Sequence, residues 1–120
     1  MIEAHSIEKS GFCPQVIFEG WKTAFITYSE DYGDLMRVKR HLKTDEVVIL
    51  IQGEATLYTL EGDTVLEMPL AIGKTYNVKA GTWHHIRLGV DAMGYIVENS
   101  NTTKENTEVR EIATTTKKEF

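Results

Sequence analysis

The chain of 120 residues lacks several features that mark specialised classes of protein. Its one cysteine, Cys13, cannot form an internal disulfide, and a lone cysteine fits a reducing compartment. No apolar run approaches the roughly 20 residues of a membrane-spanning helix, and the first residues have neither the basic start nor the apolar core of a signal peptide. We therefore expect a cytoplasmic protein with no membrane partner.

Basic residues are also scarce. The 13 lysines and arginines are outnumbered by 18 acidic residues, which gives a formal net charge of −5. Nucleic acids and anionic lipids are bound chiefly by dense Lys/Arg surfaces, so the charge balance argues against both partners. Hydrophobic residues make up 42% of the chain, and a domain of this length buries about two thirds of the surface of its unfolded form, so a real core is expected.

Helical patterns are rare, and short strand patterns fill the chain instead. Glycines recur at intervals of about ten residues, between runs rich in Val, Ile, Leu, Thr and Tyr, which is typical of an antiparallel sandwich or barrel. The pattern predicts short strands within residues 16–18, 24–28, 35–42, 46–52, 55–60, 64–68, 75–78, 83–88 and 93–98.

The last 20 residues differ in composition from the rest. We expect one barrel over residues 1–100 and a polar extension over residues 101–120, with an edge strand at 108–112 and a frayed tail at 114–120. A helical turn is predicted near residues 103–107, capped by Asn101 or Thr102.

The strand at residues 46–52 is apolar on both faces. Val48 and Leu50 point one way, and Val47, Ile49 and Ile51 point the other. A strand of this kind needs cover on both sides, so we expect a central position and either a second layer or a homodimer partner outside the barrel.

Two histidines and a carboxylate stand near the ends of predicted strands. Imidazole and carboxylate are good ligands for Zn, Mn, Fe or Ni, and three protein ligands leave positions open for substrate. His41, Glu46 and His84 can form such a site. Without that role, His41 is an ordinary strand-end histidine and His84 is half of a polar pair with His85.

The same residues resemble two motifs of the cupin family. His41, Glu46 and Gly53 match the second half of G-x5-H-x-H-x3,4-E-x6-G, and Gly73, Gly81 and His84 match G-x5-P-x-G-x2-H-x3-N. The resemblance implies an all-β fold, a small antiparallel double-stranded β-helix or jelly-roll barrel, in which three histidines and a glutamate usually hold a divalent metal. Lys39 stands where cupins have the first of these histidines, Lys79 replaces the proline and Leu88 the asparagine.

Lys39 leaves two alternatives open for the pocket. A charged lysine repels a metal and must lose its proton before it can bind one. Either His41, Glu46 and His84 hold the metal alone, or the pocket is free of metal and lined by cations, with Lys39 paired to Glu46.

The register of residues 35–42 decides what else reaches the pocket. If His41 faces inward, strand alternation places three further residues on the inner face, namely Leu35, Arg37 and Lys39. Arg37 and Lys39 then predict an anionic ligand, because a guanidinium grips carboxylate or phosphate in a fork. The opposite register buries Met36 and Val38 and turns His41 away from the pocket.

The segment from Gly81 to His85 reads G-T-W-H-H, which resembles the G-x-W-H-H segment of ureidoglycolate lyases. That resemblance implies that Trp83 and His85 contact the substrate and that the reaction is of lyase type.

We therefore expect a cupin-type enzyme that acts on a small carboxylated metabolite by lyase, isomerase or dioxygenase chemistry. His84 and Glu46 are the predicted catalytic residues, as general acid or base or as metal ligands, and Arg37, Lys39, Trp83 and His85 are predicted to bind substrate. One alternative is a non-catalytic cupin that binds a small anionic or sugar ligand or a metal. Another is a barrel that has lost its site and serves as a dimerisation unit.

Overall fold

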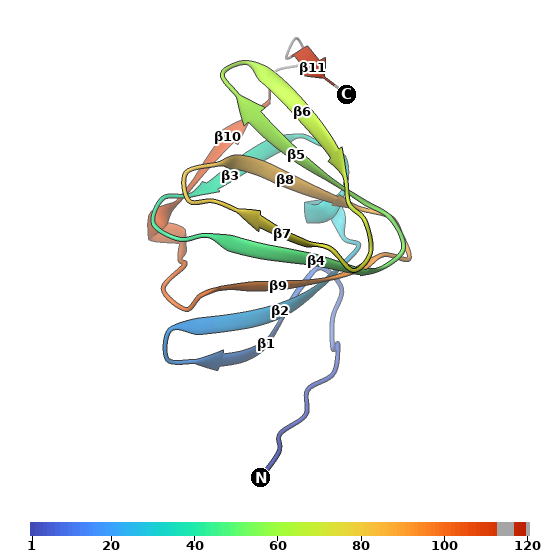
Figure 1. The fold of residues 1–120 in the computed structure, drawn as a ribbon, viewed down its shortest axis with the longest axis vertical. Helices are drawn as coiled ribbons and strands as arrows, with labels where there is room; N and C mark the ends of the chain where they lie inside the picture. Colours follow the sequence, from blue (N-terminus) through green and yellow to red (C-terminus); the bar gives the residue numbers. More distant parts are fainter. Residues whose placement is uncertain (113–116, 120) are drawn as a thin grey trace.

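The computed structural model describes residues 1–112 and 117–119, and their regular secondary structure consists almost entirely of β-strands (Figure 1). Within these residues the helical segments are two short 3-10 turns, η1 (Glu30–Tyr32) and η2 (Lys104–Asn106). None of the described helices is long and apolar enough to cross a membrane. The all-β class predicted from glycine spacing and strand patterning is confirmed.

The strands form two sheets. In spatial order, the first contains β1 (Phe12–Phe18), β2 (Trp21–Thr27), β9 (Met93–Asn99), β4 (Glu46–Gln52) and β7 (Thr75–Val78). The second contains β10 (Thr107–Glu111), β3 (Arg37–His41), β8 (Trp83–Leu88), β5 (Ala55–Glu61), β6 (Thr64–Pro69) and β11 (Lys117–Glu119). Strands far apart in sequence are neighbours in both sheets, as β9 is to β2 and β4.

The C-terminal extension lies along both edges of the second sheet. β10 pairs with β3 at one edge, within one residue of the predicted edge strand. β11 pairs in parallel with β6 at the other edge, where frayed chain was expected, and residues 113–116 and 120 of that segment lie outside the described residues. The predicted turn forms as η2, but it is Thr103 that precedes it and donates its backbone N–H to Asn106 Oδ1 (2.9 Å).

The main core lies between the two sheets. It combines side chains from the inner faces of both, chiefly Ile26, Val48, Leu50 and Ile96 from the first and Leu57, Ile86 and Leu88 from the second. These residues alternate along their strands with side chains that face outward, as the period of two in a strand requires. Truncating one of them to alanine would cost about 2–5 kcal/mol of stability.

A second, smaller cluster covers the outer face of the second sheet. It contains Val38, Tyr58, Leu60 and Val65, with Leu35, Trp83 and Ile112 packed against it. This cluster explains why Val38 is buried although its strand turns His41 inward, because Val38 lies on the outer face of β3, which the cluster covers.

β4 lies between β9 and β7, so it is an interior strand as predicted. Glu46, Val48 and Leu50 are buried on its inner face, whereas Val47 and Ile49 are only half-buried on the other. Ile51, at the end of the strand, is 44% exposed. The outer face of this sheet therefore carries apolar surface that the described chain leaves partly open.

Candidate functional site

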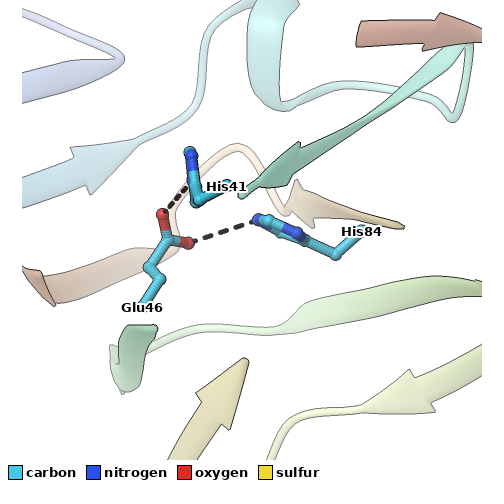
Figure 2. A group of neighbouring side chains, drawn as sticks. All are labelled: His41, Glu46 and His84. Carbon is cyan, nitrogen blue, oxygen red and sulfur yellow. Dashed lines mark hydrogen bonds and ion pairs between the residues drawn. The ribbon is translucent and has the colours of Figure 1, made fainter. Parts of the chain in front are cut away.

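Three strand ends bring His41, Glu46 and His84 together (Figure 2). His41 is the last residue of β3, Glu46 the first of β4, and His84 the second of β8. Gly81 joins two of these ends, because its backbone N–H donates to the His41 carbonyl over 2.8 Å. Gly81 has a φ of +83°, a conformation that glycine adopts without strain, so the glycine of the second motif shapes the site directly.

The three side chains form one buried cluster between the sheets. Glu46 Oε1 lies 3.1 Å from His41 Nε2, and Glu46 Oε2 lies 3.6 Å from His84 Nε2. The side chains of Glu46 and His84 are only 8% and 7% exposed. The donor atoms of all three residues lie within 4.8 Å of one another, which brings the predicted metal ligands to one point.

The hydrogen bond made by Nδ1 of each histidine fixes the tautomer of its ring. His84 Nδ1 lies 2.9 Å from the Thr82 carbonyl oxygen, which can only accept, so Nδ1 carries a proton. His41 Nδ1 lies 2.9 Å from the Thr107 hydroxyl, whose own proton is donated to the Thr103 carbonyl (2.7 Å). His41 Nδ1 is therefore also a donor. In the neutral state, both Nε2 atoms present bare lone pairs to the Glu46 carboxylate.

Lone pairs that face a carboxylate need a positive charge between them, either a proton or a metal ion. The donor set fits a divalent metal, since it joins two imidazoles oriented through Nδ1 with a carboxylate. The cluster also favours protonation. Burial by itself raises the pKa of Glu46, but hydrogen bonds from His41 and His84 outweigh it and lower the pKa to about 2. Burial lowers the pKa of His84, and its contact with Glu46 more than reverses this, so the pKa is raised.

The cluster borders a cavity of about 230 Å³. Arg37 and Lys39 line the same cavity, so β3 has the register that turns His41 inward. Lys39 lies directly opposite His84 in the β3–β8 pairing, the one register pair between these strands. In the described part of the chain, Lys39 makes no ion pair, and the predicted alternative of a Lys39–Glu46 pair is not formed.

The inward register does not extend to the residues before β3. Leu35, expected on the inner face, packs against the outer cluster, while Met36, expected outside, lines the cavity. Both residues precede the first residue of the strand, so strand alternation does not govern them.

Trp83 and His85 extend from β8 away from the triad. Trp83 packs on the outer cluster, with the Arg40 guanidinium 4.4 Å from its ring centre, and it is not among the residues that line the cavity. His85 reaches the cavity edge, where its Nε2–H donates to the Gly33 carbonyl (2.8 Å). His85 thereby anchors the loop that carries η1, and burial lowers its pKa.

Several further cavity residues escaped the sequence analysis, among them Tyr32 and Glu98. Tyr32 lies in η1, where no periodic pattern indicates a direction, and burial raises the pKa of its phenol. Glu98 could have been found, because it follows the inward-facing Gly94 and Ile96 at the period of a strand. Burial and the neighbouring Glu46 carboxylate raise the pKa of Glu98.

No protein-family model matches the sequence, and a search of curated proteins found no relative. Solved structures do match the fold. PAC13 from Streptomyces, a nucleoside dehydratase solved with uridine, is 10% identical and superposes with a TM-score of 0.67 over 94% of each chain.

Two other similar structures belong to proteins that are described by their domain. A protein with a double-stranded β-helix domain from Klebsiella pneumoniae is 14% identical, with a TM-score of 0.64 over 90% of each chain. A cupin-2 domain protein from Shewanella frigidimarina is 18% identical, with a TM-score of 0.56 over 75% of this chain and 81% of its own. None of these three is described as a ureidoglycolate lyase, so that local resemblance stays a prediction. The chain therefore has the cupin fold, a double-stranded β-helix, as the two sequence motifs predicted.

Proposed function

We propose that the protein is a small-molecule enzyme of lyase type that holds a divalent cation at His41, Glu46 and His84. The observation that carries the proposal is the orientation of both Nε2 atoms toward one buried carboxylate, with both Nδ1 atoms engaged by other partners. A bound cation would supply Lewis-acid polarisation of a substrate oxygen.

The substrate class that fits best is a small carboxylated metabolite. Arg37 and Lys39 line the cavity on the side of β3, and both are exposed, so they can meet an incoming anion. Arg37 offers the planar fork that binds a carboxylate through two hydrogen bonds. The volume of about 230 Å³ lies below the roughly 300–1,000 Å³ of pockets for drug-sized ligands, which favours a compact metabolite.

Lyase chemistry needs one group to remove a proton and another to protonate the leaving group. The cavity offers several groups for proton transfer besides the cation ligands, including the phenol of Tyr32 and the carboxyl of Asp31. The likeness in fold to PAC13, which is a dehydratase, supports lyase chemistry as the first reaction class to test. Isomerase and dioxygenase chemistry belong in the same screen.

A second candidate is a metal-free acid–base site. It is favoured by the raised pKa of His84 and the lowered pKa of Glu46, which stabilise an imidazolium–carboxylate pair. In that form His84 is the general acid.

The test is a product-detecting screen. Chelator-treated protein, with or without added Zn²⁺, Mn²⁺, Fe²⁺ or Ni²⁺, is incubated with small hydroxy acids, keto acids and ureido acids, with uridine as a non-carboxylated comparison, and products are read by mass spectrometry. Cation-dependent turnover that is lost in His84→Ala and retained in the surface variant His5→Ala supports the proposal. Ligands that raise Tm without being consumed would instead support a binding protein.

We further propose that the protein is a homodimer that covers the outer face of the first sheet. The half-buried Val47 and Ile49 and the exposed Ile51 support this face as the contact. Sedimentation velocity should give a dimer for the wild type and a monomer for Ile51→Glu. Val90→Glu, at a residue 83% exposed in a turn, is the matched control and should remain dimeric.

A further inference from the structure

Glu98 faces Glu46 directly across the ladder between β9 and β4. The two residues are register partners, and both line the cavity with His41 and His84. Their side chains are 7% and 8% exposed, so neither carboxylate is well hydrated. Like charges placed opposite each other in a sheet are destabilising, which makes this buried pair costly unless a proton or a cation offsets one of the charges.

The described structure supplies only part of that compensation. Lys22 Nζ lies 3.7 Å from Glu98 Oε1, a long ion pair, and the same ammonium donates to the Thr102 carbonyl over a shorter distance of 2.7 Å. Lys22 is thus held mainly by the backbone at the end of the barrel. Two carboxylates and two imidazoles oriented through Nδ1 therefore line the same cavity, while Lys22 contacts Glu98 from outside the cavity lining.

We propose that Glu98 is a second carboxylate ligand of the cation centre, which completes a set of two histidines and two carboxylates. This inference rests on the proposed cation site at His41, Glu46 and His84. It also explains how the site can bind a cation although Lys39 replaces a histidine ligand of the first cupin motif on β3. The missing ligand is supplied from β9. Glu98 is not among the three residues whose donor atoms lie within 4.8 Å of one another, so its carboxylate would have to leave Lys22 to bind the cation. An added carboxylate shifts the preference of the site toward Mn²⁺ and Fe²⁺, which accept oxygen ligands more readily than Zn²⁺ does.

The test is a metal titration of the chelator-treated full chain, without substrate. Binding of Mn²⁺ and Zn²⁺ is followed by calorimetry, and the coordination geometry by the visible spectrum of the Co²⁺ form. Glu98→Gln keeps the size of the side chain and should weaken Mn²⁺ binding at least tenfold, weaken Zn²⁺ binding less, and change the Co²⁺ spectrum. Glu61→Gln, at the exposed last residue of β5, is the matched control and should bind as the wild type does.

A second variant separates ligation from a purely structural Lys22–Glu98 pair. Lys22→Met removes the competing ammonium, so Glu98 as a ligand predicts tighter Mn²⁺ binding, and adding Glu98→Gln to this variant should abolish the gain. If Glu98 serves only Lys22, both single variants lower Tm while Mn²⁺ affinity and the Co²⁺ spectrum stay unchanged, which overturns the inference but leaves the three-residue site intact. Absence of metal binding in the wild type overturns the cation site itself, and the Glu98 inference with it.

Discussion

His84 turns Nε2 toward the Glu46 carboxylate, 3.6 Å from Oε2, while the Thr82 carbonyl holds its Nδ1–H over 2.9 Å. This pair joins the two sheets, since Glu46 begins β4 and His84 lies in β8. Because its backbone partner fixes the tautomer of His84, the nitrogen that faces Glu46 is the one free to take a proton or a metal. The predictions below test that relationship and the residues that support it.

Thr107 positions His41 without touching the cavity centre. Its hydroxyl accepts from His41 Nδ1–H and donates to the Thr103 carbonyl. Thr107→Val removes both bonds and should weaken divalent metal binding about 10–100-fold, the usual cost of losing a partner that orients a metal ligand. Thr107→Ser keeps the hydroxyl and should bind nearly as the wild type does. Calorimetry measures both, with Thr75→Val at an exposed strand position as the control; equal weakening in Thr75→Val would show that the effect is not local.

Lys39→His should increase metal affinity. Lys39 lies opposite His84 and lines the cavity, so an imidazole at this position is placed to become a further ligand, and a repelling charge is removed. Because the variant also loses the positive charge of Lys39, it should bind a carboxylated ligand more weakly. Zn²⁺ affinity at least tenfold above the wild type is expected in a competition assay with a chromogenic chelator. Unchanged Zn²⁺ affinity would mean that position 39 does not reach the cation.

Arg37 should contribute to the binding of an anionic ligand and not to the binding of the cation. Its side chain is exposed and contacts Glu111 over 3.4 Å, a surface pair worth little to stability. Arg37→Gln should therefore leave Tm within about 2 °C and raise the KM or Kd of a carboxylated ligand about tenfold, with kcat much less affected. Lys43→Gln, at an exposed residue next to the site, is the control for a general loss of positive charge. An equal effect in the two variants would argue against a specific anion contact.

Chelator-treated protein should be most stable between about pH 4.5 and 6.5. The pKa of Glu46 is lowered from 4.5 to about 2 in the folded protein, so its contribution is present above pH 4.5 and is lost as the pH falls toward 2. The pKa of His84 is raised above 6.5, so its contribution is complete below pH 6.5 and disappears as the pH rises through the folded value.

Urea unfolding of the wild type and Glu46→Gln across this pH range isolates the contribution of the pair. The stability difference between the two proteins should be largest near pH 5.5 and shrink on both sides. Metal affinity should instead rise with pH above pH 5. Both imidazoles must be neutral to bind the metal, and a higher pH removes their protons. A stability difference independent of pH would show that the two side chains do not titrate together.

Much of the site followed from sequence because it depends on local spacing. The intervals from His41 to Glu46 and from Gly81 to His84 place these residues at strand ends that the fold brings together. Trp83 was predicted at the cavity, yet it alternates with His84 along β8 and so points to the opposite face. The interpretation of that segment followed a short resemblance and not the period of the strand.

The residues that sequence analysis missed depend on long-range pairing. Thr107 reaches His41 because β10 pairs with β3, and Glu98 reaches Glu46 because β9 pairs with β4. The period of β9 could have placed Glu98 on an inward face, but neither pairing has a local signal in the sequence. The second core on the outer face was missed for the same reason, because it needs side chains from four strands and from Ile112 in the polar extension. That cluster buries Val38, whose burial had been taken as a sign of the opposite register.

The most direct test of the central claim is a Co²⁺ and Zn²⁺ titration of chelator-treated protein that carries no affinity tag. We predict one bound ion per chain with a Kd below about 1 μM, and at least 100-fold weaker binding in His84→Ala and Glu46→Gln. His5→Ala should bind as the wild type does. Failure of the wild type to bind either ion, or equal binding by the wild type and these site variants, would contradict a cation centre at His41, Glu46 and His84.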